Sequence, residues 1–246
     1  MEKSIFYDIN ILSRIKNLCE NTCIDDQINI YMNLKYVIDN IITSVAADGI
    51  FTHNGSDYHI SNFDTTRVLC MFNIIGNLDE THREFKYDIS KWDISNVKDM
   101  SRMFYNTTYT SDAPLTWEFF SENLNDMRGM FSYAKINTSI KYLWYTVNVT
   151  NMIEMFEGAE INTSISFNTP NVTNMYRMFL YATINGTINF SDWNVSSVTN
   201  MYSMFYKCTF SSDLDLSRWD VRNVKHYDYF SSGQYELKLP NFNTTN

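Results

Sequence analysis

One motif recurs along this chain at a nearly constant interval, and that interval constrains the architecture more than any other feature. The motif is complete in WDISNVKDMSRMF (92–104) and in WNVSSVTNMYSMF (193–205). Its second half recurs at 123–131, 148–156 and 171–179, and degraded copies begin at Phe63 and Trp219. Successive copies lie 23 to 29 residues apart, measured from the first Met or from Tyr227 in the last copy. Repeats of this length stack into solenoids, so the sequence predicts about seven turns of roughly 26 residues each.

The apolar residues of each copy are spaced as on one face of a short helix. Val97, Met100, Met103 and Phe104 lie at i, i+3, i+6 and i+7, which predicts about two helical turns. A polar residue precedes the Val or Leu and would cap the helix: Asn96, Asn123, Asn148, Asn171, Ser197 and Asn223. A second polar residue, three positions later, would support the helix start: Asp99, Asp126, Asn151, Asn174, Asn200 and His226.

Short strands are expected at the start of the copies, where apolar residues alternate: Trp92/Ile94, Trp193/Val195 and Trp219/Val221. The expected fold is therefore an α/β solenoid, leucine-rich-repeat-like, with about seven strand-plus-short-helix turns and an N-terminal helical cap.

The consensus W-[DN]-[VI]-S-[NS]-V-[TK]-[ND]-M-x-x-M-F resembles the BspA-like leucine-rich repeats. It looks most like the repeat domain of unknown function described in mycoplasma surface lipoproteins and in amoebal giant-virus proteins. The resemblance covers roughly residues 60–231. It implies a leucine-rich-repeat-like solenoid and a role in protein interaction, and it carries over no catalytic residue. The surface members have a secretion leader and a lipid-anchor cysteine, which this sequence does not show.

The chain is expected to divide into three parts. Residues 1–58 predict a helical N-terminal cap and a connecting hairpin, residues 59–234 the repeat solenoid, and residues 235–246 a C-terminal edge strand and tail. A solenoid needs its apolar ends covered. Two apolar stripes predict the cap helices, the first with Ile5, Ile9, Leu12, Ile15 and Leu18, the second with Ile30, Leu34, Val37, Ile38, Ile41 and Val45. A separate partner-binding module is the alternative for this N-terminal part.

Charge and hydropathy limit the partners. The formal net charge of -9, with no run of Lys or Arg, argues against nucleic acid. No apolar stretch is long enough to span a membrane, so membrane insertion is not expected. The expected location is intracellular (cytoplasmic) or virion-associated, with the cell surface only if a leader has been removed.

Residues that could bind a metal, react or bind a ligand are scattered along the sequence. His53 and His59 could share a metal, but surface histidines are the favoured interpretation, and the four cysteines (Cys19, Cys23, Cys70 and Cys208) are expected to be reduced thiols. Trp92, Trp193 and Trp219 could form a carbohydrate platform, although their regular recurrence favours core packing. Ten N-x-[ST] strings occur. In a secreted eukaryotic protein they would be glycosylation acceptors, but by-products of the repeat are the favoured interpretation, since several are its Asn-Val-Thr. We therefore expect no enzyme, no catalytic, cofactor or metal residue and no cofactor.

The function expected from these features is non-catalytic: a protein–protein interaction or scaffold protein that uses the solenoid surface. One alternative is a structural component of a virus particle or surface layer. Another is a surface adhesin that binds host protein or glycan. The binding residues, the identity of the protein partner and the oligomeric state are left open by the sequence.

Overall fold

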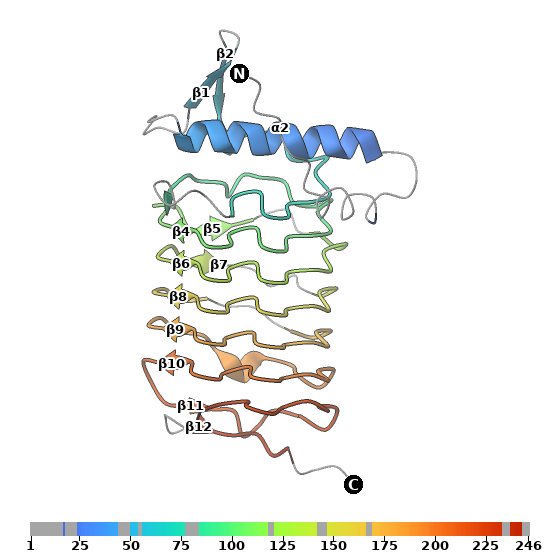
Figure 1. Ribbon diagram of the computed structural model, residues 1–246, viewed down its shortest axis with the longest axis vertical. Coiled ribbons are helices and arrows are strands. Elements are labelled where there is room, and N and C mark those ends of the chain that lie inside the picture. The colour runs from blue at the N-terminus through green and yellow to red at the C-terminus, as the bar shows by residue number, and fades with distance from the viewer. Residues whose placement is uncertain are drawn as a thin grey trace.

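The protein is described here by a computed structural model that covers residue 17 and residues 24–43, 50–53, 56–76, 84–117, 121–141, 147–165, 169–232 and 237–242. These residues form a parallel β-solenoid of about six turns. Helix α2 (Ile24–Thr43) lies across its N-terminal end, and the coils stack in chain order below it (Figure 1).

The strands are short, and most lie along one edge of the solenoid (Figure 1). A six-stranded parallel sheet contains, in spatial order, β10 (Thr209–Phe210), β9 (Thr183–Ile184), β8 (Glu160–Ile161), β6 (Lys135–Ile136), β4 (Thr108–Tyr109) and β3 (Glu84–Phe85). Two further parallel pairs join β5 (Leu115–Thr116) to β7 (Ile140–Lys141) and β11 (Leu214–Asp215) to β12 (Leu237–Lys238). The 3-10 helices η1 (Ile60–Asn62) and η2 (Phe190–Asp192) and the antiparallel hairpin of β1 (Ile50–His53) and β2 (Ser56–His59) complete the elements.

The short helix expected in each repeat is absent from the part of the repeats that the structure describes. Two consecutive tight turns take its place. In one coil, Met130 N donates to Met127 O (3.2 Å) and Ala134 N donates to Phe131 O (3.1 Å). The third residue of each turn is left-handed, with φ of 57° at Gly129 and 57° at Tyr133. Two four-residue turns place apolar residues inward at nearly the same spacing as a helix. The spacing of the apolar residues therefore predicted a helix where the structure has turns.

Hydrogen bonds between coils replace those that a helix would make within itself. Gly129 N donates to Ile153 O at 2.8 Å, and Phe131 N donates to Met155 O at 2.9 Å, both in the next coil. Isolated parallel bridges extend this ladder through Cys70, Asp99, Asp126, Asn151, Asn174, Asn200 and His226. The backbone of one coil is therefore satisfied by residues about one repeat away in sequence.

The strands also occupy a different part of the repeat from the one expected. They follow the small residue after each Phe, as β6 follows Ala134, and within the described residues none is formed by the Trp92/Ile94, Trp193/Val195 or Trp219/Val221 pairs. The three tryptophans are buried in the core. Two of their indoles donate to backbone carbonyls, Trp92 Nε1 to Ile60 O (2.9 Å) and Trp219 Nε1 to Phe190 O (3.0 Å). Because the three tryptophans are buried, they cannot form a carbohydrate platform, and their predicted packing in the core is confirmed.

Four of the five asparagines expected to cap helices instead join neighbouring coils. Asn96 Nδ2 donates to Thr66 O (2.8 Å), and Asn223 Nδ2 donates to Ser196 O (2.7 Å). Asn148 and Asn171 bond in the same way to Glu122 O and Val147 O. The polar residue three positions later accepts a local backbone bond, as Asp126 Oδ1 does from Arg128 N at 2.9 Å. It thereby fixes the first tight turn of the coil.

The core is a set of ladders built from equivalent positions. Neighbouring phenylalanines stack at centroid separations of 5.0, 5.5, 5.2 and 5.3 Å along the series Phe104, Phe131, Phe156, Phe179 and Phe205. The Met-x-x-Met residues are buried beside them. The repeat register read from the sequence is thus confirmed at these positions.

Both ends of the solenoid are in contact with non-repeat chain. Tyr31 of α2 donates its hydroxyl to Phe72 O at 2.7 Å, while Leu34 and Ile38 are fully buried. The predicted second helix and the hairpin are confirmed, whereas the first apolar stripe lies outside the described residues. At the other end, Leu237 pairs with Leu214 as expected for an edge strand. No helix in the described ranges has the length and apolar character needed to cross a membrane.

Candidate binding surface

The paired turns of several coils expose tyrosines, which follow one another along the solenoid. We call this line the tyrosine stripe; it consists of Tyr105, Tyr133, Tyr176, Tyr181, Tyr202, Tyr206 and Tyr229. These residues occupy the variable positions between and after the Met-x-x-Met-Phe core residues, where side chains point away from the core. Tyr133, Tyr181 and Tyr229 are the most open, with 50%, 51% and 63% of their surface exposed. Exposed aromatic residues that gather on one surface, unlike isolated ones, are typical of interaction sites.

The rings pack against one another from coil to coil. Tyr176 stacks on Tyr202 with a centroid distance of 5.5 Å. Tyr229 makes T-shaped contacts with Tyr202 and Tyr206, each at a centroid distance of 5.8 Å. Tyr181 makes a T-shaped contact with Tyr206 at a centroid distance of 6.5 Å. Each of these five rings is therefore held in place by its neighbours.

Cationic side chains lie on the same stripe. The guanidinium of Arg177 lies 4.8 Å from the Tyr176 ring centre, and that of Arg102 lies 5.4 Å from the ring of Tyr105. Lys207 Nζ lies over two rings, 5.4 Å from Tyr181 and 5.6 Å from Tyr206. Ring quadrupoles attract cations in this geometry. Tyrosine and arginine together are the composition of binding hot spots.

An acidic residue interrupts the stripe near its middle. Tyr133 Oη donates to Glu157 Oε1 at 3.2 Å. Burial raises the pKa of Glu157 above its ordinary value, and the neighbouring Glu154 carboxylate adds to the rise, against the opposing charges of Arg177 and Arg102. The Glu157 carboxylate is thus held at the hydroxyl end of Tyr133.

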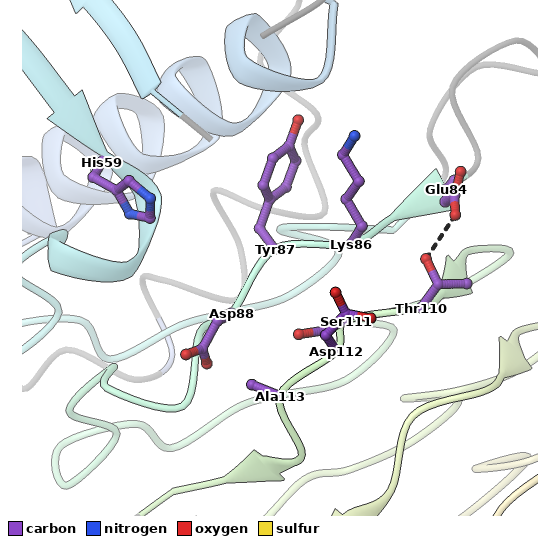
Figure 2. Close-up of a pocket in the computed structure, with 9 residues that line it drawn as sticks. All are labelled: His59, Glu84, Lys86, Tyr87, Asp88, Thr110, Ser111, Asp112 and Ala113. Carbon is purple, nitrogen blue, oxygen red and sulfur yellow. Dashed lines mark hydrogen bonds between the residues drawn. The ribbon is translucent and has the colours of Figure 1, made fainter. Parts of the chain in front are cut away.

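A polar depression of about 540 Å³ lies near the N-terminal end, between η1 and the first coils. Its lining residues are His59, Glu84, Lys86, Tyr87, Asp88, Thr110, Ser111, Asp112 and Ala113. Figure 2 shows Lys86 and Tyr87 side by side, pointing away from Ser111 and Asp112, with His59 at the far side. Thr110 Oγ1 donates to Glu84 Oε1 at 2.7 Å across one rim. Hydroxyl and carboxylate groups of this kind can hold a small polyhydroxy ligand.

Beneath this depression, Tyr109 is anchored in the core. Burial raises the pKa of the Tyr109 hydroxyl, with Asp88 adding to the rise and a hydrogen bond to Ser111 opposing it. Tyr109 is therefore part of the core and not of the lining of the depression.

The described histidines and cysteines do not come together in a metal site. His59 Nδ1 accepts from Ser61 N at 3.2 Å, and the described ranges contain no group of three His, Cys, Asp or Glu residues able to hold a metal ion. Cys70 and Cys208 are buried free thiols, and burial raises the pKa of Cys208. Cys19, Cys23 and the side chain of His53 lie outside the described residues.

Two surface features were not predicted from the sequence. The first is the tyrosine stripe. The frequent occurrence of Tyr at the variable positions of the motif could have indicated it. The second is a ladder of exposed asparagines beside the sheet, in which Asn162 Nδ2 donates to Asn137 Oδ1 and Asn185 Nδ2 to Asn162 Oδ1, each at 2.8 Å. Three of the N-x-[ST] strings therefore owe their position to the sheet edge and not to the inter-coil asparagines.

Stacked coils, ladders of equivalent core residues and a varied aromatic surface define a parallel β-solenoid repeat protein. A family model described as Mycoplasma protein of unknown function, DUF285, matches residues 46–143 and again residues 125–241. The chain belongs to this family, which covers most of its length. No curated protein and no solved structure matches the chain.

Proposed function

We propose that the chain is a non-catalytic protein-interaction scaffold that binds its partner through the tyrosine stripe. The observation that carries the proposal is the contrast between positions within one repeat. The Met and Phe positions are nearly invariant and buried, while the turn positions vary and carry exposed tyrosines with cations stacked on them. A rigid aromatic surface loses little conformational entropy on binding.

Kinship with the BspA-like leucine-rich repeats is part of the same proposal. The shared motif supports it, as does a solenoid that presents one continuous face. The alternative role, as a stiff structural component of a virus particle or surface layer, would use the same inter-coil hydrogen bonds without requiring an exposed aromatic stripe. We therefore favour the binding role, in an intracellular or virion-associated setting.

The polar depression favours a second candidate function, that of a glycan-binding adhesin. Sugar sites combine an aromatic ring with carboxylates and hydroxyls, and Tyr87, Asp88, Asp112 and Thr110 provide these groups around one opening. A glycan array probed with the full chain tests this candidate. Binding that is lost in Asp112→Asn and Tyr87→Ala, and retained when Tyr181 is changed, would favour the adhesin over the scaffold.

The scaffold proposal is tested by site-specific photo-crosslinking in extract of the native host. A photoreactive phenylalanine is placed at Tyr181 or Tyr229 of the stripe, and a matched one at Asn185 on the exposed edge of the sheet. The two stripe positions should capture the same protein, and Asn185 should not. Equal capture from all three positions, or none from the stripe, would contradict the proposal.

A further inference from the structure

We infer that the C-terminal half of the tyrosine stripe recognises an acidic segment of a partner protein, with Arg177 and Lys207 each meeting a carboxylate. The patch consists of Tyr176, Arg177, Tyr181, Tyr202, Tyr206, Lys207 and Tyr229. This inference rests on the proposed scaffold function and adds to it the chemistry of the partner.

The two cations of the patch form no ion pair within the described residues, unlike several other cations of the surface. Arg67, Arg128, Lys135, Arg222 and Lys238 each pair with a carboxylate. Neither Arg177 nor Lys207 forms an ion pair with a carboxylate of the residues that the structure describes. The Nε of Arg177 is buried and has no hydrogen-bond partner among those residues. The positive charges of Arg177 and Lys207 are therefore not neutralised by an ion pair within the described residues.

Both cations are also held in position. Arg177 lies 4.8 Å from the Tyr176 ring, and Lys207 spans the rings of Tyr181 and Tyr206 at 5.4 and 5.6 Å. Long side chains normally lose rotamer freedom when they form an ion pair, and stacking removes part of that cost in advance. A guanidinium that stacks by its face can still use its two terminal amino groups for a bidentate carboxylate contact.

Acidic residues mark the two limits of the patch. Glu154 and Glu157 lie in the preceding coil, and Asp228 lies in the following one. The charge of Arg177 opposes the rise in the pKa of Glu157, although the two side chains do not form an ion pair. The chain as a whole has a net charge of -9, but at physiological salt charges are screened over about 8 Å. The local charges, and not the net charge of the chain, therefore decide which groups are attracted to the patch.

A nucleic acid fits this surface less well than an acidic protein segment. Single strands are bound by grooves with many cations along the backbone and by free ring faces on which bases stack. Here two cations are present, the faces of Tyr176 and Tyr202 cover each other, and Lys207 lies over Tyr181 and Tyr206. A short segment with two carboxylates and apolar residues between them matches the exposed ring edges and the cations together.

The test selects random dodecapeptides displayed on phage against the full-length chain. The selected peptides should be enriched in Asp and Glu over the starting library. Their synthetic versions should lose at least about tenfold in affinity for Arg177→Gln/Lys207→Gln, as expected for charged interface contacts. The matched variant Arg218→Gln/Lys225→Gln removes the same charge outside the stripe and should bind as the parent does. Circular dichroism checks folding, and Lys207→Glu, at an exposed position, replaces the double variant if that one unfolds.

Each other outcome overturns the inference in a distinguishable way. Selected peptides that need Tyr181 and Tyr229 but contain no excess of acid would leave the scaffold function standing and remove the acidic partner. Acidic peptides that bind Arg177→Gln/Lys207→Gln unchanged would do the same. A labelled oligo-dT that binds more tightly than the peptides and depends on the same two cations would assign the patch to nucleic acid. Peptides that bind without the stripe, or no enrichment at all, would count against both proposals.

Discussion

The ring of Tyr133 lies directly on the backbone of Gly158 in the next coil. A β-carbon at residue 158 would come within 2.6 Å of Tyr133 Cδ1 and 2.7 Å of Cε1. Gly158 is also left-handed, with φ of 62°, a conformation that costs other residues energy. Glycine therefore serves two purposes here: it allows the turn, and it leaves room for one tyrosine of the stripe to lie flat and reach Glu157.

Replacing Gly158 with alanine should reduce stability and displace Tyr133. The left-handed conformation alone costs about 1–2 kcal/mol for a residue with a β-carbon, and the contact with the ring should add to this cost. Gly129→Ala is the matched control, because Gly129 has φ of 57° but its nearest neighbour, Arg102 Cγ, would be 3.4 Å from the β-carbon. Chemical denaturation of both variants measures the difference, and equal losses would show that the ring yields freely.

Changing an inter-coil asparagine to aspartate should separate its role from that of a cap. Asn223→Asp loses the donor to Ser196 O and places a carboxylate against that carbonyl, so stability should fall by about 1 kcal/mol. A helix cap would tolerate Asp as well as Asn. Asn200→Asp is the control, because Asn200 Oδ1 accepts from Tyr202 N and should change stability by less than about 0.5 kcal/mol. Thermal melts that show no difference between the two variants would contradict these assignments.

Truncating a stacked phenylalanine should be costly. Phe156 is fully buried and lies between Phe131 and Phe179. Phe156→Ala should cost about 3–5 kcal/mol through lost burial and the cavity left behind. Phe156→Leu, which fills more of the space, should cost clearly less in the same urea titration. A loss below about 1 kcal/mol for the alanine variant would be incompatible with a packed core ladder.

The stability contribution of Glu157 should depend on pH with an opposite sign to that of Glu160. Burial raises the pKa of Glu157 in the folded state, so its ionisation opposes folding and stability falls as the pH rises through the carboxyl range. Glu157→Gln should therefore be more stable than the parent at neutral pH, and this gain should vanish in acid. The variant's melting temperature, followed from acidic to neutral pH, tests the sign.

Glu160 provides the comparison for that measurement. A hydrogen bond from Asn162, together with Lys135, lowers the pKa of Glu160, so its ionised form favours folding. Glu160→Gln should lose stability at neutral pH and approach the parent as the pH falls. If both variants shift in the same direction, the two carboxyls do not have the environments described above.

The sequence by itself determined the solenoid, the repeat register and the core. Met127, Met130 and Phe131 recur as equivalents in every regular copy, and apolar residues at such fixed intervals can be buried together only when the copies stack. The helix across the N-terminal end was also predictable, since its apolar stripe, which includes Leu34 and Ile38, is long and continuous.

Only the tertiary structure decided the path of the chain within a coil and the position of the binding surface. Local spacing fits a helix and a pair of tight turns equally well, and the choice depends on hydrogen bonds such as Gly129 N to Ile153 O, whose partner lies in another coil. The same is true of Asn223, whose amide has its acceptor in the preceding coil. Tyr181, Tyr206 and Lys207 likewise form one surface only because stacking brings separate repeats into contact.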